Sequence, residues 1–234
     1  MGYELYYWPE IQGRGEFVRL ALEEAGADYV DVARGEGGVA TLIDLMEQAD
    51  RPPFAPPFLR DGEVLIGQTA AILLYLGPKL GLAPRAEVGR LWVHQIQLTI
   101  SDAVAEAHDT HHPIDVELFY KDQKPEARRR AAAFRRARIP KFLSWFETLL
   151  ARNPDGFLVG NRLTYADLSL FQLVEGLSYA FPKVMKGALK QAPRVAALRQ
   201  AVAGRPRLSA YLASKRRIPF NEDGIFRHYS ELDG

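Results

Sequence analysis

The chain changes character near residue 80, and this change limits the folds open to it. Before this point, Gly and Pro interrupt short segments that alternate between strand and helix signals; after it, long stretches follow helical spacing. Charge divides at the same place, with 6 basic and 13 acidic residues in 1–80 but 24 basic and 16 acidic residues in 81–234. The sequence therefore predicts two domains, residues 1–80 and 88–234, joined by a linker at 81–87.

The first part predicts the order β-α-β-(α)-β-β-α. A strand signal at 3–8 stops at Pro9, a helix at 16–25 stops at Gly26, and weaker signals suggest a strand at 29–33 and a helix at 41–48. A hairpin turns at Asp61-Gly62 within 58–66, and a helix follows at 70–76. The second part predicts helices near 86–110, 126–151, 165–180, 193–203 and 207–214, and then a tail from Ile218 without strong periodicity.

Composition excludes several classes of protein. With 234 residues, of which 47% are hydrophobic, the chain can bury a sizeable core, and its formal net charge of +1 gives no general attraction to nucleic acid or anionic membranes. The lack of cysteine excludes disulfides, zinc–thiolate sites and a cysteine nucleophile. No apolar run reaches the roughly 18 residues of a membrane span, and Met1–Tyr7 lacks the pattern of a secretory signal. We therefore expect a cytoplasmic protein.

Four local patterns point to one family. They are Tyr7-Trp8-Pro9 with Gly13-Arg14-Gly15, then Ala55-Pro56-Pro57-Phe58, then Gln68-Thr69 at a helix start, and Gly160-Asn161-Arg162-Leu163-Thr164-Tyr165-Ala166-Asp167. In the last, Thr164 and Asp167 have the spacing of a capping box. With the order of elements, these patterns make nearly the whole chain resemble the tyrosine-type cytosolic glutathione transferases. The resemblance implies an α/β thioredoxin-like N-terminal domain and an all-α helical C-terminal domain.

The same resemblance implies a site for glutathione as co-substrate. Tyr7 would face the sulfur with Arg14 nearby; neighbouring strand residues point to opposite faces, so only one of Tyr6 and Tyr7 can do so, and the motif favours Tyr7. The γ-glutamyl carboxylate would lie at Gln68 and Thr69, because a helix N-terminus offers free N–H groups and partial positive charge. Asp102 would reach the glutathione amine across the interface of a homodimer.

The remaining glutathione contacts depart from the family pattern. Pro57 fits the position of a cis-proline, and the preceding Pro56 has no N–H, so one of the two backbone hydrogen bonds to glutathione should be missing. The family's Trp-and-Lys pair for the glycine carboxylate is not visible in 34–51. Arg51 or Arg34 could replace it.

For the second substrate, the resemblance implies a pocket at Trp8, His108, His112 and Phe220. His108 and His112 have the i,i+4 spacing that places two ligands on one helix face, but Pro113 follows at once and no Glu lies between them as in zinc hydrolases. We expect no metal. The tail with Phe220 and Phe226 would either close over this pocket or form a surface strap.

A basic cluster offers a different reading. It comprises Arg128, Arg129, Arg130, Arg135, Arg136 and Arg138, with only Phe134 as an interleaved aromatic. Such a helix could touch phosphates. Because the whole chain is nearly neutral, we expect a solvated helix face and no nucleic-acid partner.

Taken together, these residues and the resemblance that they carry imply a homodimeric glutathione transferase with a role in detoxification. A tyrosine hydroxyl would stabilise the glutathione thiolate, which attacks a hydrophobic electrophile; peroxide reduction and isomerisation are close variants of this chemistry. The alternative is a non-catalytic module of the same fold that carries ligands or binds proteins, because a fold does not fix a function.

Overall fold

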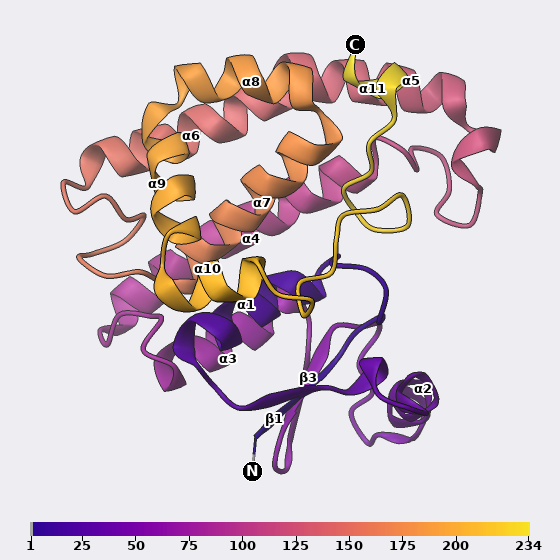
Figure 1. The fold of residues 1–234 in the computed structure, drawn as a ribbon, viewed down its shortest axis with the longest axis vertical. Helices are drawn as coiled ribbons and strands as arrows, with labels where there is room; N and C mark the ends of the chain where they lie inside the picture. The colour runs from indigo at the N-terminus through magenta and orange to yellow at the C-terminus, as the bar shows by residue number, and fades with distance from the viewer. Residues whose placement is uncertain (1) are drawn as a thin grey trace.

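The computed structural model describes residues 2–234 and begins with a four-stranded sheet (Figure 1). Its strands are β1 (Tyr3–Tyr6), β2 (Tyr29–Asp31), β3 (Phe58–Asp61) and β4 (Val64–Gly67), in the spatial order β2-β1-β3-β4. β1 runs parallel to β2 and antiparallel to β3, and the β3–β4 hairpin is antiparallel. This mixed sheet with its helices is the predicted thioredoxin-like arrangement.

Helices cover both faces of the sheet. On one face, α1 (Gly15–Ala25) and α3 (Thr69–Lys79) bury apolar side chains against Leu5 and Leu59. On the other, the 3-10 turn η1 (Val32–Arg34) and α2 (Gly38–Gln48) cover Tyr6 and Phe58. Leu5 and Tyr6 are adjacent in β1, so the alternation of side chains along a strand directs them to opposite faces.

The rest of the chain is helical. It comprises α4 (Glu87–His108), η2 (Tyr120–Asp122), α5 (Lys124–Ala133), η3 (Phe134–Arg138), α6 (Ile139–Arg152), α7 (Tyr165–Ala180), α8 (Pro182–Gln191), α9 (Pro193–Ala203), α10 (Pro206–Leu212) and α11 (Ser230–Asp233). The predicted helix at 126–151 is interrupted by the π-helical turn η3, and the sequence did not predict α8 and α11. Among the described residues, no helix combines the length and apolar character needed to cross a membrane.

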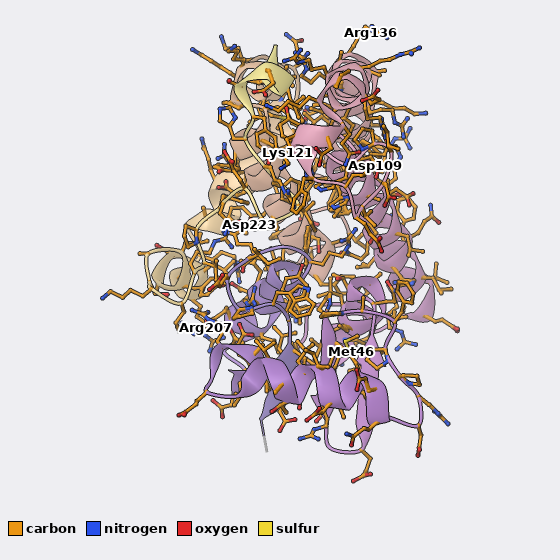
Figure 2. All side chains as sticks on the ribbon, turned by 90° about the vertical axis from the view of Figure 1, so that its right-hand side faces the viewer. Met46, Asp109, Lys121, Arg136, Arg207 and Asp223 are labelled. Carbon is orange, nitrogen blue, oxygen red and sulfur yellow. The ribbon has the colours of Figure 1, made fainter. Side chains whose placement is uncertain are left out.

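The sheet and the helical bundle share one apolar core. Phe17 and Leu20 of α1 and Leu73 of α3 belong to the same buried cluster as Ile100 of α4 and Phe171 of α7. In Figure 2 the sheet domain, with Met46 of α2, forms the lower layer, and the helical bundle, with Arg136 at its far end, forms the upper layer. The C-terminal segment, residues 213–234, begins after α10, which lies beside α1, runs along the helical bundle and ends beside α5 (Figure 1).

The predicted capping box is present at the start of α7. The Asp167 carboxylate accepts hydrogen bonds from the backbone N–H and the hydroxyl of Thr164, both at 2.8 Å, and from the Leu158 N–H at 2.7 Å. Asp167 is fully buried, and this burial raises its pKa to about 6. The motif therefore joins the loop before α7 to the helix itself.

Half of the basic cluster is engaged within the molecule. Arg138 makes a two-pronged contact with Glu106 at 2.7–3.0 Å, Arg130 lies 3.7 Å from both Glu106 and Asp109, and Arg135 donates to the Asp233 carbonyl. These contacts tie the α5–α6 region to α4 and to the C-terminus, which agrees with a structural role for the cluster.

Candidate functional site

Tyr7 follows β1 directly and is the residue around which the candidate site is built. Its hydroxyl oxygen accepts a hydrogen bond from the Arg14 backbone N–H at 2.9 Å, and the side chain is only 4% exposed. Within residues 2–234, no acceptor is paired with the proton of this hydroxyl. Burial raises the pKa of Tyr7, and the Arg14 N–H opposes that rise. At neutral pH the group is therefore a protonated phenol, free to donate.

Two glycines make this close approach possible. A Cβ atom on Gly13 would lie 1.9 Å from the Tyr7 hydroxyl oxygen, and one on Gly15 would lie 2.6 Å from the Tyr7 ring. Gly13 also has φ +43°, a conformation that favours glycine. The Gly13-Arg14-Gly15 turn is thus shaped to lie against Tyr7.

Tyr6 is engaged on the opposite face of the sheet. Its hydroxyl donates to Glu4 at 2.9 Å, and its ring stacks on Phe58 with centroids 4.6 Å apart. Burial and the bond to Glu4 raise the pKa of Tyr6 to about 12. Of the two tyrosines, only Tyr7 has a hydroxyl proton without a partner among the described residues.

The N-terminus of α3 borders a cavity of about 290 Å³ between the sheet domain and α4. Arg14, Gln68 and Thr69 line it, so the structure brings these three predicted residues together. No acceptor in the described part of the chain is paired with the N–H groups of Thr69, Ala70 and Ala71, and α3 has no side-chain cap. The cavity therefore has a partly positive end suited to a carboxylate.

Gln68 stands in an unusual backbone conformation beside this cavity. It has φ +65°, and it is the one residue other than glycine with positive φ in the described chain. Such a conformation costs on the order of 1–3 kcal/mol and is typical of functional positions. Thr69 follows and donates its hydroxyl to the Arg14 carbonyl at 3.4 Å, which links the cavity to the turn beneath Tyr7.

The opposite wall of the cavity, on α4, was not predicted from the sequence. His94, Gln97 and Ser101 face it, and both the Gln97 side-chain oxygen and the His94 Nδ1 are buried without a hydrogen-bond partner in the described residues. The available signal was weak: three polar residues spaced three and four apart on an otherwise apolar helix face.

Other predicted glutathione contacts lie outside this cavity. The Pro56–Pro57 peptide is cis, as the resemblance implied, and Pro57 is buried just before β3. Asp102 is exposed on α4. Arg51 lines a separate depression with Asp50 and Glu63. Neither Asp102 nor Arg51 lines the cavity, so their roles stay predictions.

Arg34, the alternative to Arg51, has its own partners. Its guanidinium donates to the Arg216 carbonyl at 2.7 Å and lies 3.9 Å from Asp31. It therefore ties η1 to the segment after α10.

The four residues predicted for the second-substrate pocket lie on three separate segments of the chain: Trp8 shortly after β1, His108 and His112 at the end of α4, and Phe220 in the C-terminal segment. Phe220 stacks on Tyr179, with centroids 4.9 Å apart, and lines a small hollow together with Gly13. Trp8 is 39% exposed. His108 lies at the end of α4, where the positive charge of Arg14 helps to lower its pKa, and His112 stacks on it. The buried His111, the third histidine of this stretch of sequence, joins these two histidines.

Comparisons with known proteins show which proteins the chain is similar to. Residues 108–215 match the family model described as "Glutathione S-transferase, C-terminal domain". The chain is 26% identical over 220 residues to the glutathione S-transferase of Plasmodium falciparum, covering 91% of this chain and 95% of that protein. It is 28% identical over 228 residues to glutathione S-transferase P of Bos taurus, covering 95% and 98%.

Solved structures match the fold over almost its full length. The Pi-class glutathione S-transferase of Onchocerca volvulus superposes with a TM-score of 0.74 at 23% identity, covering 96% of this chain and 99% of that one. The structure of prostaglandin synthase D from Nilaparvata lugens gives 0.73 at 20% identity, covering 94% and 100%. Residues 108–215 thus match the C-terminal domain of the glutathione S-transferase family, and the chain over almost its full length is similar to glutathione S-transferases in sequence and in fold.

Proposed function

We propose that this chain conjugates glutathione to a hydrophobic electrophile and that the Tyr7 hydroxyl stabilises the glutathione thiolate. The observation that carries the proposal is the Tyr7 hydroxyl, which accepts from the Arg14 N–H while its own proton has no partner in residues 2–234. A phenol polarised in this way is a suitable donor to a sulfur anion.

The energetics of one hydrogen bond suffice for this role. A free thiol with a pKa of about 8.5 is only about 3% thiolate at pH 7, whereas a pKa of about 6.5 makes roughly three quarters thiolate. That shift corresponds to about 2.7 kcal/mol, and a hydrogen bond to a charged acceptor contributes about 1.5–3 kcal/mol.

Glutathione would be oriented by the α3 cavity. Its γ-glutamyl carboxylate would accept from the free N–H groups at Thr69 and Ala70, with Gln68 and Arg14 beside it. The Pro56 carbonyl would accept from the cysteinyl N–H, although Pro56 has no N–H to return. Arg51 is our candidate for the glycine carboxylate.

The reaction then balances simply. The thiol proton leaves to solvent, the thiolate sulfur forms a bond to an electrophilic carbon, and the leaving group departs with its electron pair. The electrophile would bind near Phe220, Trp8, His108 and His112, where aromatic surface gives broad selectivity. The same thiolate could reduce an organic hydroperoxide, in which case two glutathione molecules are oxidised to their disulfide and the hydroperoxide becomes an alcohol and water. It could also add reversibly to a substrate and isomerise it.

We also propose a homodimer formed along α4. Val88, Leu91 and Leu98 are exposed by 81%, 61% and 47%, and together with the exposed Gln95 and Asp102 they follow the alternating three-and-four spacing of a helix–helix seam. A second copy of the chain would cover this stripe and bring Asp102 toward the neighbouring cavity. Leu91→Asp should then yield monomers in sedimentation experiments and weaken glutathione binding, while a dimer that survives this change would contradict the proposed interface.

A non-catalytic carrier is the second candidate function. The low exposure of Tyr7 and the position of the C-terminal segment against Gly13 favour it, because both restrict access to the hydroxyl. In that case the protein would bind glutathione without activating its thiol.

Calorimetric titration with glutathione and a conjugation assay with an activated aryl chloride distinguish the two candidates. We expect binding and conjugation in the wild type and in Tyr6→Phe, and binding without efficient conjugation in Tyr7→Phe. Binding without conjugation in the wild type would support the carrier, and no binding at millimolar glutathione would contradict both.

A further inference from the structure

Three histidines gather where α4 ends. His108 is the last residue of α4, and the backbone N–H groups of His111 and His112 both donate to its carbonyl, at 3.2 and 3.3 Å, so the helical turn continues past α4. One ligand-capable nitrogen from each ring lies within 4.8 Å of the other two. The structure therefore adds His111 to the pair His108 and His112, which have i,i+4 spacing in the sequence.

His111 is held in the orientation of a metal ligand. Its Nε2–H donates to the Ile225 carbonyl at 2.7 Å, which leaves the lone pair on Nδ1, and the side chain is 1% exposed. A ring nitrogen anchored by a backbone carbonyl is the usual outer contact of a histidine that binds metal through its other nitrogen. That Nδ1 lies 2.5 Å from the Nδ1 of His112 and accepts its N–H, so a cation bound between the two nitrogens would replace this proton, with His112 in its other tautomer.

We propose that His108, His111 and His112 bind one late first-row divalent cation, such as Zn²⁺, through one nitrogen each. Imidazole is a preferred ligand of Zn²⁺, Cu²⁺ and Ni²⁺. Zn–N bonds of about 2.0–2.1 Å place tetrahedral ligand nitrogens roughly 3.3–3.4 Å apart. To reach this spacing, the ring nitrogens of His111 and His112, now 2.5 Å apart, must separate, and the most distant pair of ring nitrogens must approach each other. Small rotations of His108 and His112 would suffice, while the hydrogen bond to Ile225 keeps His111 in place.

Burial lowers the pKa of all three rings, to about 4 in His108 and to about 2 in His111. The positive charges of Arg14 and Arg227 contribute to this lowering and would also oppose a cation. We therefore expect an anion, such as hydroxide or chloride, at the fourth position and an affinity below that of a structural zinc site.

Metal binding would also fasten the C-terminal segment. His111 joins α4 to Ile225, whose neighbour Phe226 lies against Gly176 of α7. A cation on the trio would therefore hold the end of α4 and this segment in one arrangement. The expected result is a higher melting temperature in the presence of the metal, because a ligand that binds only the folded chain stabilises it.

The test uses the full chain without a histidine tag, after treatment with a chelator. Titration with Co²⁺ is followed by visible absorbance of the tetrahedral ion, and Zn²⁺ is then added to displace it. We expect one equivalent of Co²⁺ to bind, with affinity reduced at least about tenfold in His108→Gln and in His112→Gln. His228→Gln is the matched control, since His228 lies outside the trio and should leave binding unchanged.

Circular dichroism of each variant separates loss of a ligand from loss of folding. The partly buried His108 and His112 are the sites of choice, since replacement of the buried His111 also removes the bond to Ile225. The absence of a Co²⁺ spectrum at millimolar metal, or equal binding by the wild type and both ligand variants, would overturn the proposal. Because the readout contains no glutathione, the result is independent of the transferase proposal.

Discussion

Two helix N-termini in this molecule are built in opposite ways. At α7, Asp167 and Thr164 satisfy one another and the nearby backbone, and the whole motif is buried. At α3, the first N–H groups face a cavity without a cap, after a Gln68 in a strained conformation. The difference teaches that groups satisfied inside the chain serve stability, whereas groups left open are available to a ligand.

The two neighbouring tyrosines repeat this contrast at the end of β1. Tyr6 donates its proton to Glu4, while the proton of Tyr7 has no acceptor in residues 2–234. Removal of an open group should therefore reduce activity and spare stability, and removal of a satisfied group should do the reverse.

The largest expected effect is that of Tyr7→Phe. The variant keeps the ring but loses the hydroxyl, so the bound thiol should return toward its free pKa and kcat/KM at pH 7 should fall about 10- to 100-fold. Steady-state kinetics with glutathione and an aryl chloride measure this change. Equal rates in the wild type and the variant would remove Tyr7 from the mechanism.

Gly13→Ala should displace the Tyr7 hydroxyl, because the added methyl group would occupy its position. The new Cβ would lie 1.9 Å from the Tyr7 oxygen, so we expect about tenfold lower activity and a loss of about 1–3 kcal/mol in stability. Gly156→Ala is the matched control, since Gly156 has φ +79° but open space around it. If both variants lose activity equally, backbone strain and not contact with Tyr7 is the cause.

Asp167 gives a prediction about pH. Its folded pKa of about 6 is above the ordinary value of 3.8, so between about pH 4 and pH 6 the folded state binds more protons than the unfolded state. The contribution of Asp167 to the free energy of unfolding should therefore decline by about 2–3 kcal/mol as the pH rises through this window. Urea unfolding of the wild type and Asp167→Asn at several pH values measures it; parallel pH profiles would contradict the assignment.

The smallest effect is expected for Tyr6→Phe. Loss of the hydrogen bond to Glu4 should reduce the free energy of unfolding by about 0.5–1.5 kcal/mol and leave kcat/KM unchanged. Chemical denaturation and the conjugation assay together check both statements. A loss of activity comparable to that of Tyr7→Phe would break the contrast between the two tyrosines.

Local signals in the sequence predicted those parts of the fold that depend on local chemistry. Thr164 and Asp167 stand three residues apart and close their capping box within one helical turn. Gly26 ends α1 in a left-handed conformation, as expected for a glycine after an apolar helix face. By contrast, α8 was not predicted although Val184, Met185, Ala188 and Leu189 have helical spacing, because the helix is short and its Pro182 and Gly187 are also typical of loops.

The parts of the site that depend on tertiary contacts could not be read in the same way. The face of α4 that carries Gln97 becomes a cavity wall only because α3 and Arg14 lie opposite. Likewise, His111 completes the histidine trio because the carbonyl of Ile225, 114 residues away in the chain, fixes its ring. The spacing of residues along the sequence predicts neither the approach of α3 to α4 nor that of Ile225 to His111.

The most direct test of the account is the pKa of the thiol in the glutathione complex. Thiolate absorbance is recorded against pH for the wild type, Tyr6→Phe and Tyr7→Phe, each saturated with glutathione. We predict a pKa of about 6.5 in the first two and a return toward about 8.5 in Tyr7→Phe. An unshifted thiol in the wild type, or the same shift in all three proteins, would contradict activation of glutathione by Tyr7.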